Sequence, residues 1–191
     1  MTTTRPRTDA ARNWQRIVEV GREHVDAGRA IQLNEIARAA SVGVATVYRH
    51  FPGPGALMET LAQPGMADLI ERGERAMTGQ DPAGALEEFL LDALQAQAAD
   101  PALAQVFAAS QHDLPATTQS AQRLVGLLGE LLSRAHGIGE VDPDVTLADL
   151  VPLVCGVVHA ATLRTTDTAD RAAAVRLYLA VVMQGLRPVT S

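Results

Sequence analysis

The chain has 191 residues, a net charge of −6 and a hydrophobic share of 47%. This length can bury a core that is stable without cross-links, and the single cysteine, Cys155, excludes an intramolecular disulfide. Cys155 stands in an apolar run, which indicates a buried, inert thiol in a reducing compartment. Because residues 1–11 contain no apolar segment typical of a secretory signal, we expect the protein to stay in the cytoplasm.

The negative total hides an uneven distribution of charge. Residues 1–60 hold eight Arg and six acidic residues, a net charge of +2, whereas residues 61–191 hold eight Arg and sixteen acidic residues, a net charge of −8. The overall charge therefore does not exclude nucleic acid as a partner of the N-terminal part.

Apolar residues recur at helical spacing along the chain, and no segment alternates apolar and polar residues as a strand would. The sequence predicts an all-α fold of about nine helices, at 10–27, 33–40, 44–50, 54–78, 82–98, 101–110, 116–136, 143–164 and 168–186.

In the first predicted helix the apolar residues lie on one face. This pattern puts Trp14 in the core together with Ile17, Val18, Gly21 and Val25.

Three Asp-Pro pairs mark predicted helix starts, because Asp accepts a hydrogen bond as N-cap and Pro suits the first turn. They are Asp81-Pro82, Asp100-Pro101 and Asp142-Pro143. The longest stretch without Asp, Glu or Arg, Leu150–Leu163, is shorter than the roughly 20 residues that a membrane span requires. We interpret this stretch as a buried helix and expect no association with a membrane.

Residues 33–51 read LNEIARAASVGVATVYRHF and predict two short helices joined by a tight turn. The small side chains of Ala37 and Ala40 allow these helices to cross closely at the steep angle of a helix-turn-helix. Several apolar residues complete a three-helix core with the first helix: Leu33, Ile36, Val42, Val47 and Phe51. The second helix then keeps an outer face of Val44, Ala45, Thr46, Tyr48, Arg49 and His50.

The run IARAASVGVATVYRHFP, followed by Ala56-Leu57, resembles the DNA-binding signature of the TetR family, and the match covers about residues 12–62. The resemblance implies a helix-turn-helix domain at residues 1–53 and a helical domain for ligand binding and dimerisation at residues 54–191. The function it implies is a sequence-specific repressor, not an enzyme. A small-molecule effector would pivot the helix that links the domains and so release the operator DNA.

Three positions depart from the family pattern. Ser41 replaces the usual turn Gly, and Gly43 replaces the usual Ser or Thr cap, which weakens the N-cap. Pro52-Gly53-Pro54-Gly55 stands where the family places a basic residue at the start of the next helix, so one charge-assisted phosphate contact is lost. Backbone N–H groups at that helix start can still meet a phosphate.

The outer face of the second helix has the chemistry to read double-stranded DNA. Thr46, Tyr48 and His50 can donate hydrogen bonds to phosphates. Val44 and Ala45 can approach thymine methyl groups, and Arg49 is the candidate for a bidentate base contact. Arg5 and Arg7 lie on an N-terminal arm suited to phosphates or an adjacent minor groove.

The effector is expected among helices 82–98, 101–110 and 116–136. Met77, Phe89 and Phe107 favour a mostly apolar ligand, and His112, Cys155 and His159 are further candidate contacts. Only Cys155 and His159 share a helical ligand spacing, so we predict neither a metal site nor a cofactor.

Helices 143–164 and 168–186 are apolar nearly all round, which predicts that they meet their copies as the four-helix interface of a homodimer. The alternative is that they are core helices of one subunit. Two other functions stay open: a helical adaptor that binds protein instead of DNA, and a small helical enzyme. The sequence has no nucleophile elbow, phosphate loop or metal signature, and retardation of promoter DNA separates these classes.

Overall fold

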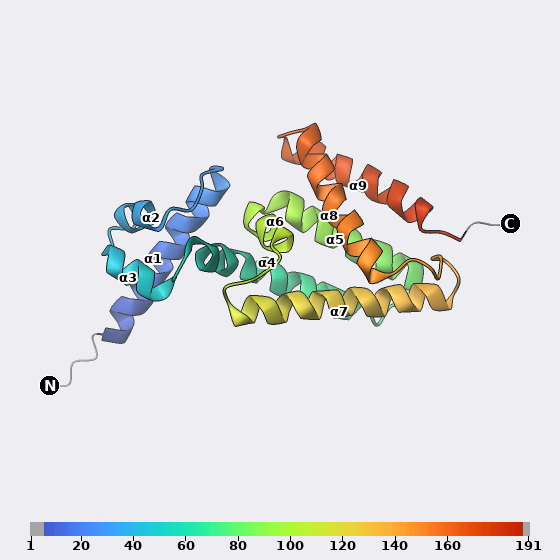
Figure 1. Cartoon of the computed structure of the whole chain (residues 1–191), viewed down its shortest axis with the longest axis horizontal. Coiled ribbons are helices and arrows are strands. Elements are labelled where there is room, and N and C mark those ends of the chain that lie inside the picture. Colours follow the sequence, from blue (N-terminus) through green and yellow to red (C-terminus); the bar gives the residue numbers. More distant parts are fainter. Residues whose placement is uncertain (1–5, 189–191) are drawn as a thin grey trace.

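The computed structural model describes residues 6–188, and every regular element in that range is an α-helix (Figure 1). The all-α prediction is confirmed. The helices are α1 (Pro6–Asp26), α2 (Leu33–Ala39), α3 (Val44–His50), α4 (Pro54–Ala76), α5 (Pro82–Ala99), α6 (Pro101–Ala108), α7 (Pro115–Gly137), α8 (Leu147–Arg164) and α9 (Thr168–Gly185).

The start of α1 differs from the prediction. It begins at Pro6, not near residue 10, so Arg7 belongs to the first helical turn instead of an irregular arm. Arg5 lies outside the described residues.

Two of the three Asp-Pro pairs begin helices as predicted. The Asp81 carboxylate accepts a hydrogen bond from the Gly84 N–H at 3.1 Å, and the Asp100 carboxylate accepts one from the Ala102 N–H at 2.8 Å. Each cap satisfies one of the N–H groups that a helix start leaves without a partner.

The prediction from the third pair was wrong, because Asp142 lies in a turn. Its N–H donates to the Leu186 carbonyl at 2.8 Å, which fixes the turn to the end of α9. The helix α8 begins five residues later, where Thr146 and Asp149 form a capping box. Hydrogen bonds from the Thr146 hydroxyl and N–H hold the pKa of Asp149 below its usual value.

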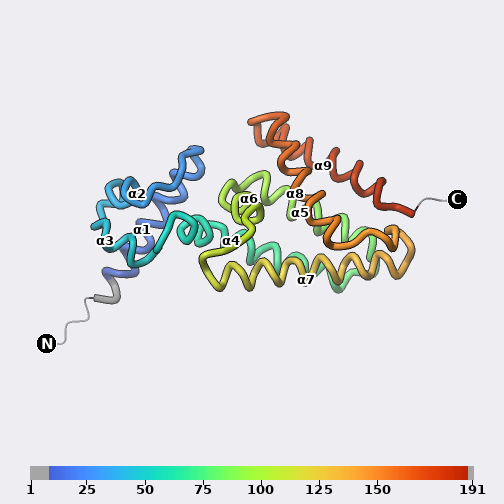
Figure 2. The backbone as a smooth tube through the Cα atoms, in the orientation of Figure 1, coloured from blue at the N-terminus to red at the C-terminus, as the bar shows by residue number. Residues whose placement is uncertain are grey.

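The helices form two groups that α4 connects (Figure 1). Helices α1, α2 and α3 pack together at one end with the start of α4, and the rest of α4 packs against α5, α6 and α7. Helices α8 and α9 pack on each other and on α5. The tube in Figure 2 shows that the segment between α6 and α7 passes beside α4.

The N-terminal core contains the fully buried side chains of Ile17, Ile36, Val47 and Leu57. The placement of Trp14 in that core was wrong, because its side chain is 42% exposed. The apolar stripe of α1 continues one turn before Ile17, but the helices that cover Ile17 leave that turn open.

The C-terminal core is larger, and its helices cross closely at Gly73. A Cβ on Gly73 of α4 would lie 2.8 Å from Phe89 of α5 and 2.9 Å from Leu127 of α7. Glycine is therefore what allows these three helices to approach one another.

Among the described helices, α8 alone is long and apolar enough in composition to cross a membrane. It packs against α5, α7 and α9, and its buried residues include Leu150, Val154 and Ala161.

Candidate DNA-binding surface and effector cavity

The turn between α2 and α3 is held in a left-handed conformation at Ser41, whose φ is 53°. This is the position where the sequence departs from the usual glycine. The Val42 N–H donates to the Ala37 carbonyl at 2.9 Å and closes the turn. Gly43 then begins α3 in an extended conformation without a side-chain cap, as its residue type predicts.

Arg16 of α1 fixes this turn from the side. Its guanidinium donates to the carbonyls of Ala40 at 2.7 Å and Ser41 at 3.1 Å. Hydrogen bonds from a charged donor are the stronger kind, so this contact holds α3 in a set orientation relative to α1.

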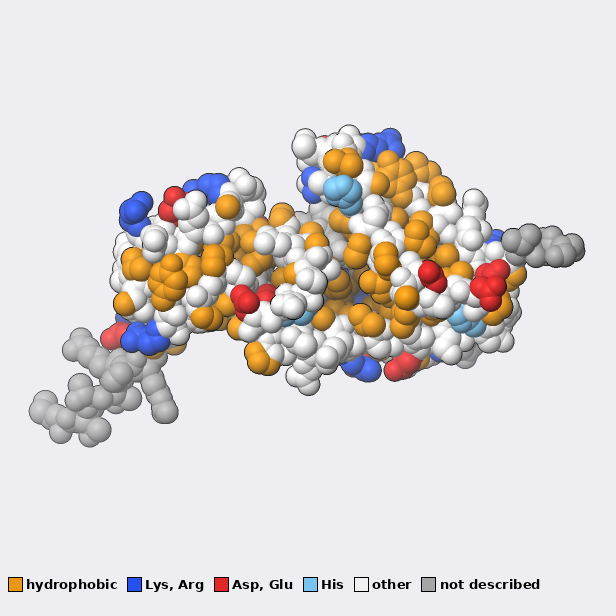
Figure 3. Space-filling model, viewed as in Figure 1, with side chains coloured by type: hydrophobic (Ala, Val, Ile, Leu, Met, Phe, Trp, Pro, Cys, Tyr) orange, Lys and Arg blue, Asp and Glu red, His pale blue; other side chains and the backbone are white. Residues whose placement is uncertain are grey.

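Helix α3 buries one side and exposes the other. Val47 is fully buried, whereas Val44 and Tyr48 are 46% and 47% exposed. Ala45 and Arg49 are also exposed. Figure 3 shows Arg side chains at the edges of this end of the molecule, with hydrophobic side chains between them. The exposed side of α3 therefore combines apolar groups, a hydroxyl and a cation.

The other two predicted contact residues of α3 are half-buried. They are Thr46 and His50. The Nε2 atom of His50 is buried without a hydrogen-bond partner among the described residues, and the ring lies 6.2 Å from that of Phe51. In this conformation Nε2 does not face solvent.

Two polar contacts join the N-terminal helices to the C-terminal group. Arg22 of α1 donates to the Asp100 carboxylate at 2.8 Å, at the junction of α5 and α6. Buried Glu59 of α4 accepts hydrogen bonds from the N–H groups of Asp113 at 2.6 Å and Leu114 at 2.8 Å. The position of α4 is thus tied to the segment that joins α6 and α7.

An apolar cavity of about 70 Å³ lies among α4, α5, α6, α7 and α8. Its walls contain Leu69, Phe89, Leu90, Ala93, Gln97, Phe107, Leu124, Val125, Leu128, Val151, Val154 and Cys155. Three of the predicted ligand contacts, Phe89, Phe107 and Cys155, are therefore brought together. Burial raises the pKa of the Cys155 thiol, so the thiol stays protonated near neutral pH.

The other three candidates lie outside this cavity. Met77 ends α4, and its carbonyl accepts a hydrogen bond from Arg134 at 2.7 Å. His112 lies between α6 and α7, and its Nδ1 is buried without a partner among the described residues. His159 is exposed on α8.

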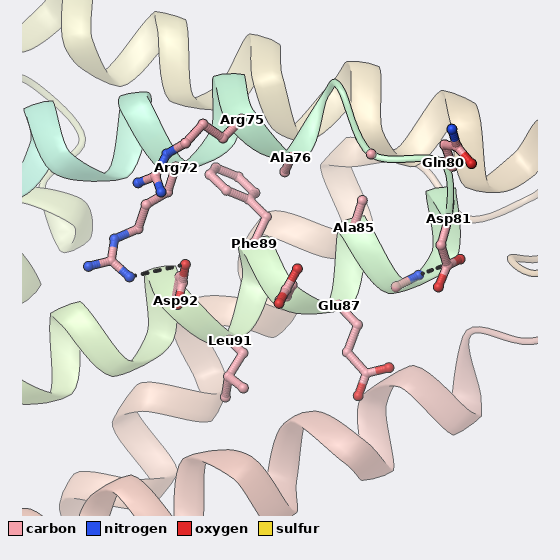
Figure 4. A pocket seen from close by; sticks show the side chains of 13 residues that line it. Arg72, Arg75, Ala76, Gln80, Asp81, Ala85, Glu87, Phe89, Leu91 and Asp92 are labelled. Carbon is pink, nitrogen blue, oxygen red and sulfur yellow. Dashed lines mark hydrogen bonds and ion pairs between the residues drawn. The ribbon is translucent and has the colours of Figure 1, made fainter.

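A wider groove of about 720 Å³ lies between the end of α4 and the start of α5 (Figure 4). Arg72 of α4 bridges it by donating to Asp92 of α5 at 3.3 Å, and it also donates to Asp68 of α4 at 2.8 Å. Both carboxylates raise the pKa of Arg72. Phe89 lines both the groove and the apolar cavity. The charges of the groove are exposed and partly paired, so it offers less desolvated surface to a ligand than the cavity does.

The residues described by the structure contain no group of three His, Cys, Asp or Glu side chains that could hold a metal ion.

Comparisons with known proteins agree with this architecture. Residues 81–188 match the family model of the C-terminal domain of SbtR-like transcriptional regulators, which is more than half of the chain. The chain belongs to the TetR family. A TetR regulator from Mycobacterium vanbaalenii is 30% identical, with 95% of this chain and 99% of that chain covered and a TM-score of 0.51.

Two further structures share the TetR-family fold. The TetR regulator SCO0520 from Streptomyces coelicolor is 28% identical, with 95% of this chain and 99% of that chain covered and a TM-score of 0.56. FadR from Bacillus subtilis, in complex with stearoyl-CoA, is 18% identical, with 91% and 100% covered and a TM-score of 0.66. A search of curated protein sequences finds no match.

Three residues of this TetR-family regulator were not among the predicted site residues, yet the tertiary structure places them at the turn, the cavity and the start of α4. Arg16 reaches the α2–α3 turn, Gln97 is a polar side chain in the cavity wall, and Asp113 lies beside the start of α4. Gln97 is only 6% exposed, and its Nε2 donates to the Ala93 carbonyl at 3.1 Å. A polar residue on an apolar helix face was the one sequence signal that could have singled out Gln97.

Proposed function

We propose that this TetR-family transcriptional regulator binds operator DNA as a homodimer and represses transcription until a small-molecule effector releases it. The observation that carries the proposal is the course of α4. This helix begins at Pro54, shortly after α3 ends at His50, and Leu69 in its second half lines the apolar cavity. A ligand that displaces α4 at Leu69 would therefore tilt α3 on the DNA.

The chemistry of α3 supports DNA as the partner. Tyr48 and Arg49 are exposed on the same side as Val44 and Ala45, which gives phosphate donors and small apolar groups on one surface. Thr46, His50, Arg5 and Arg7 stay proposed contacts. We divide the chain at residues 1–53 for DNA binding and 54–191 for ligand binding and dimerisation.

An uncovered apolar face supports the homodimer. Leu153 and Leu163 of α8 and Leu177 and Val181 of α9 are 45% to 75% exposed, although all four are large apolar side chains. A groove between these helices is lined by residues that include Pro152, Gly156 and Tyr178. A second copy of the same face would cover these side chains and form a four-helix interface. Two recognition helices roughly 34 Å apart could then occupy successive turns of the major groove.

The cavity lining supports an apolar effector with one polar group. Apart from the Cys155 thiol, Gln97 is the only polar side chain among the cavity-lining residues. A donor or acceptor on the ligand could pair with its carboxamide while the body of the ligand contacts Phe89 and Phe107. Because the cavity is about 70 Å³, a ligand larger than a few heavy atoms must move the surrounding helices. The size of the bound ligand would therefore set the positions of these helices, and this is how an effector could change DNA binding.

The decisive experiment is a footprint on the DNA upstream of its own gene, with and without a panel of candidate ligands. We expect protection of a palindromic site, affinity that falls steeply with salt, and loss of protection with an effector. Tyr48→Phe should weaken binding to all sequences, whereas Arg49→Ala should relax the preference at particular bases. A dimer that shows no salt-dependent binding to DNA would instead favour an adaptor or an enzyme.

The effector site has its own test in the Cys155 thiol. Because its pKa is raised and it lines the cavity, we expect slow alkylation that slows further when an effector is bound. Gln97→Leu should weaken binding of a polar effector more than binding of its apolar analogue. Alkylation at the same rate with and without a releasing ligand would locate the effector elsewhere.

A further inference from the structure

The polar side chain in the wall of the apolar cavity offers a hydrogen-bond acceptor. Gln97 is 6% exposed, and its Nε2 atom donates to the Ala93 carbonyl, one turn earlier on α5, at 3.1 Å. Because a carbonyl oxygen only accepts, this bond requires the amide nitrogen to face Ala93 and leaves Oε1 as the other end of the group. No described residue donates a hydrogen bond to Oε1. A ligand that pairs with Gln97 must therefore supply a donor.

None of the cavity-lining residues carries a charge. Apart from Gln97 and Cys155 they are all apolar. Burial raises the pKa of the Cys155 thiol, so the thiol is neutral near neutral pH. An ionised group that is buried without an opposite charge loses far more solvation free energy than one hydrogen bond returns. The cavity therefore disfavours a carboxylate, a phosphate or an ammonium group on the part of the ligand that it encloses.

Two Arg side chains contact α5, but neither lines the cavity. Arg72 donates to Asp92 across the neighbouring groove at 3.3 Å (Figure 4), and Arg171 of α9 donates to the Ala98 carbonyl at 2.9 Å. Residues 61–191 also carry a net charge of −8, which repels anions at long range. An anionic ligand therefore finds no cation in the cavity wall and an unfavourable field around it.

The cavity opens where α6, α7 and α8 meet. Val125 of α7 is 46% exposed, and Phe107 of α6 and Cys155 of α8 are half-buried, whereas Gln97 is almost fully buried. Figure 3 shows a recess with hydrophobic walls in this part of the molecule. Helices α7 and α8 make little contact with each other, so the cavity can widen between them. An apolar body can thus extend from Gln97 toward the surface.

The volume of the cavity favours a small ligand. A cavity of roughly 150 Å³ accepts benzene, and this cavity is about 70 Å³. A single substituted ring therefore already requires α7 and α8 to separate somewhat. A larger body requires a wider separation and exposes more of the core.

We propose that the cavity selects neutral ligands in which an apolar body of about one ring carries a hydroxyl or N–H donor. The Oε1 atom of Gln97 accepts the hydrogen bond from that donor. A ligand without a donor leaves Oε1 unpaired, and an anionic ligand buries an uncompensated charge. Gln97 thus determines specificity. This inference rests on the proposed function for the role of the ligand in DNA release, whereas the chemistry of the ligand follows from the cavity alone.

The test compares four probes of similar shape by calorimetry with the full-length protein. They are p-cresol, which carries a hydroxyl donor, 4-methylanisole, whose ether oxygen only accepts, p-xylene, which has no polar group, and p-toluate, which is ionised at neutral pH. p-Cresol should bind roughly three- to tenfold more tightly than 4-methylanisole. p-Toluate should bind at least about a hundredfold more weakly than p-cresol. Binding of p-toluate as tight as that of p-cresol would overturn the selection of neutral ligands, and binding of none of the probes would overturn the one-ring ligand.

Substitution of Gln97 tests the pairing with Oε1. Gln97→Met keeps the length of the side chain and removes the acceptor, so it should weaken binding of p-cresol roughly three- to tenfold and leave p-xylene unchanged or bound more tightly. Gln97→Leu should change the preference in the same direction. Because both probes are measured on each variant, a general loss of stability does not alter this comparison. Gln105→Met, at an exposed position of α6 that does not line the cavity, is the matched control and should leave the preference unchanged.

The outcomes separate this inference from the proposed function. A preference for p-cresol that survives in both Gln97 variants would overturn the pairing with Oε1. Release of DNA by p-toluate but not by p-cresol would overturn the ligand class and leave the proposed function intact. A Gln97-dependent preference for p-cresol, with DNA binding that no bound probe changes, would support the ligand class and count against the effector role of the cavity.

Discussion

The two ends of the molecule are both packed helices, but their candidate functional residues lie in different places relative to the core. The N-terminal helices close around a small core, and their candidate function lies on the outside of it, at Tyr48 and Arg49. The C-terminal helices are more apolar, and their candidate functions lie where the packing is incomplete. One is the cavity beside Gln97, and the other is the uncovered face around Val181. The closed core thus leaves its candidate DNA-binding surface on the outside, whereas the incompletely filled and incompletely covered core leaves candidate sites for a ligand and for a second subunit.

The largest expected effect concerns the uncovered face. Val181 is 62% exposed in the single chain, so Val181→Glu should leave the subunit folded. In a dimer it would bury an unpaired carboxylate from each subunit and cost about 3–5 kcal/mol of association free energy. Sedimentation should show a folded monomer that binds operator DNA poorly. Arg176→Glu, at an exposed polar position on α9, is the control, and a dimer that tolerates Val181→Glu would move the interface to another face.

The next effect concerns the tight crossing in the C-terminal core. Gly73→Ala forces Phe89 or Leu127 to move and should lower the free energy of unfolding by about 1–3 kcal/mol. Gly126→Ala is the matched control, because no atom lies within 4 Å of its added Cβ and it replaces glycine in another helix. That control should stabilise α7 by up to about 1 kcal/mol. Chemical denaturation of both variants measures the difference, and equal effects would mean that the crossing is loose.

A smaller effect should appear in the N-terminal region. Arg16→Ala removes two hydrogen bonds to the α2–α3 turn and should cost about 1–2 kcal/mol, since these contacts are partly exposed. We expect the affinity for DNA to fall while the helix content stays nearly unchanged. Arg12→Ala, which removes only an exposed pair with Asp9, should leave both nearly unchanged. Circular dichroism and DNA titration together would reveal a purely structural role if the two losses ran in parallel.

The smallest effect concerns the left-handed residue of the turn. Ser41→Gly relieves the strain at a φ of 53° and should stabilise the folded protein by less than about 1 kcal/mol, because glycine also loses more entropy on folding. Ala39→Gly in α2 should instead destabilise by about 1 kcal/mol. A thermal melt that gave both substitutions the same sign would contradict the strain at Ser41.

Hydrophobic periodicity predicted the helices well and the exposure of single residues less well. The apolar stripe of α1 identified the buried residues Ile17 and Val25 correctly, yet Trp14 on the same stripe is exposed. The stripe shows which face of α1 is apolar, but it does not show how far along α1 the neighbouring helices cover that face. Asp142-Pro143 carries the same start signal as Asp81-Pro82 but lies in a turn, where the Asp142 carbonyl accepts from the Val145 N–H at 3.0 Å and the Asp142 N–H donates to the Leu186 carbonyl. Local signals of this kind are overridden by partners that are distant in the sequence.

The all-helical class, the family and the exposure of Val44, Ala45, Tyr48 and Arg49 on α3 follow from the sequence alone, because they depend on local periodicity and on a motif within about fifty residues. The packing of the helices sets which apolar side chains enclose the cavity with Gln97, which apolar side chains stay uncovered on α8 and α9, and which charged groups meet across the chain. Arg16 and the α2–α3 turn are 24 residues apart, and Glu59 and Asp113 are 54 apart. Such contacts follow from how helices pack, and no pattern along the chain encodes them.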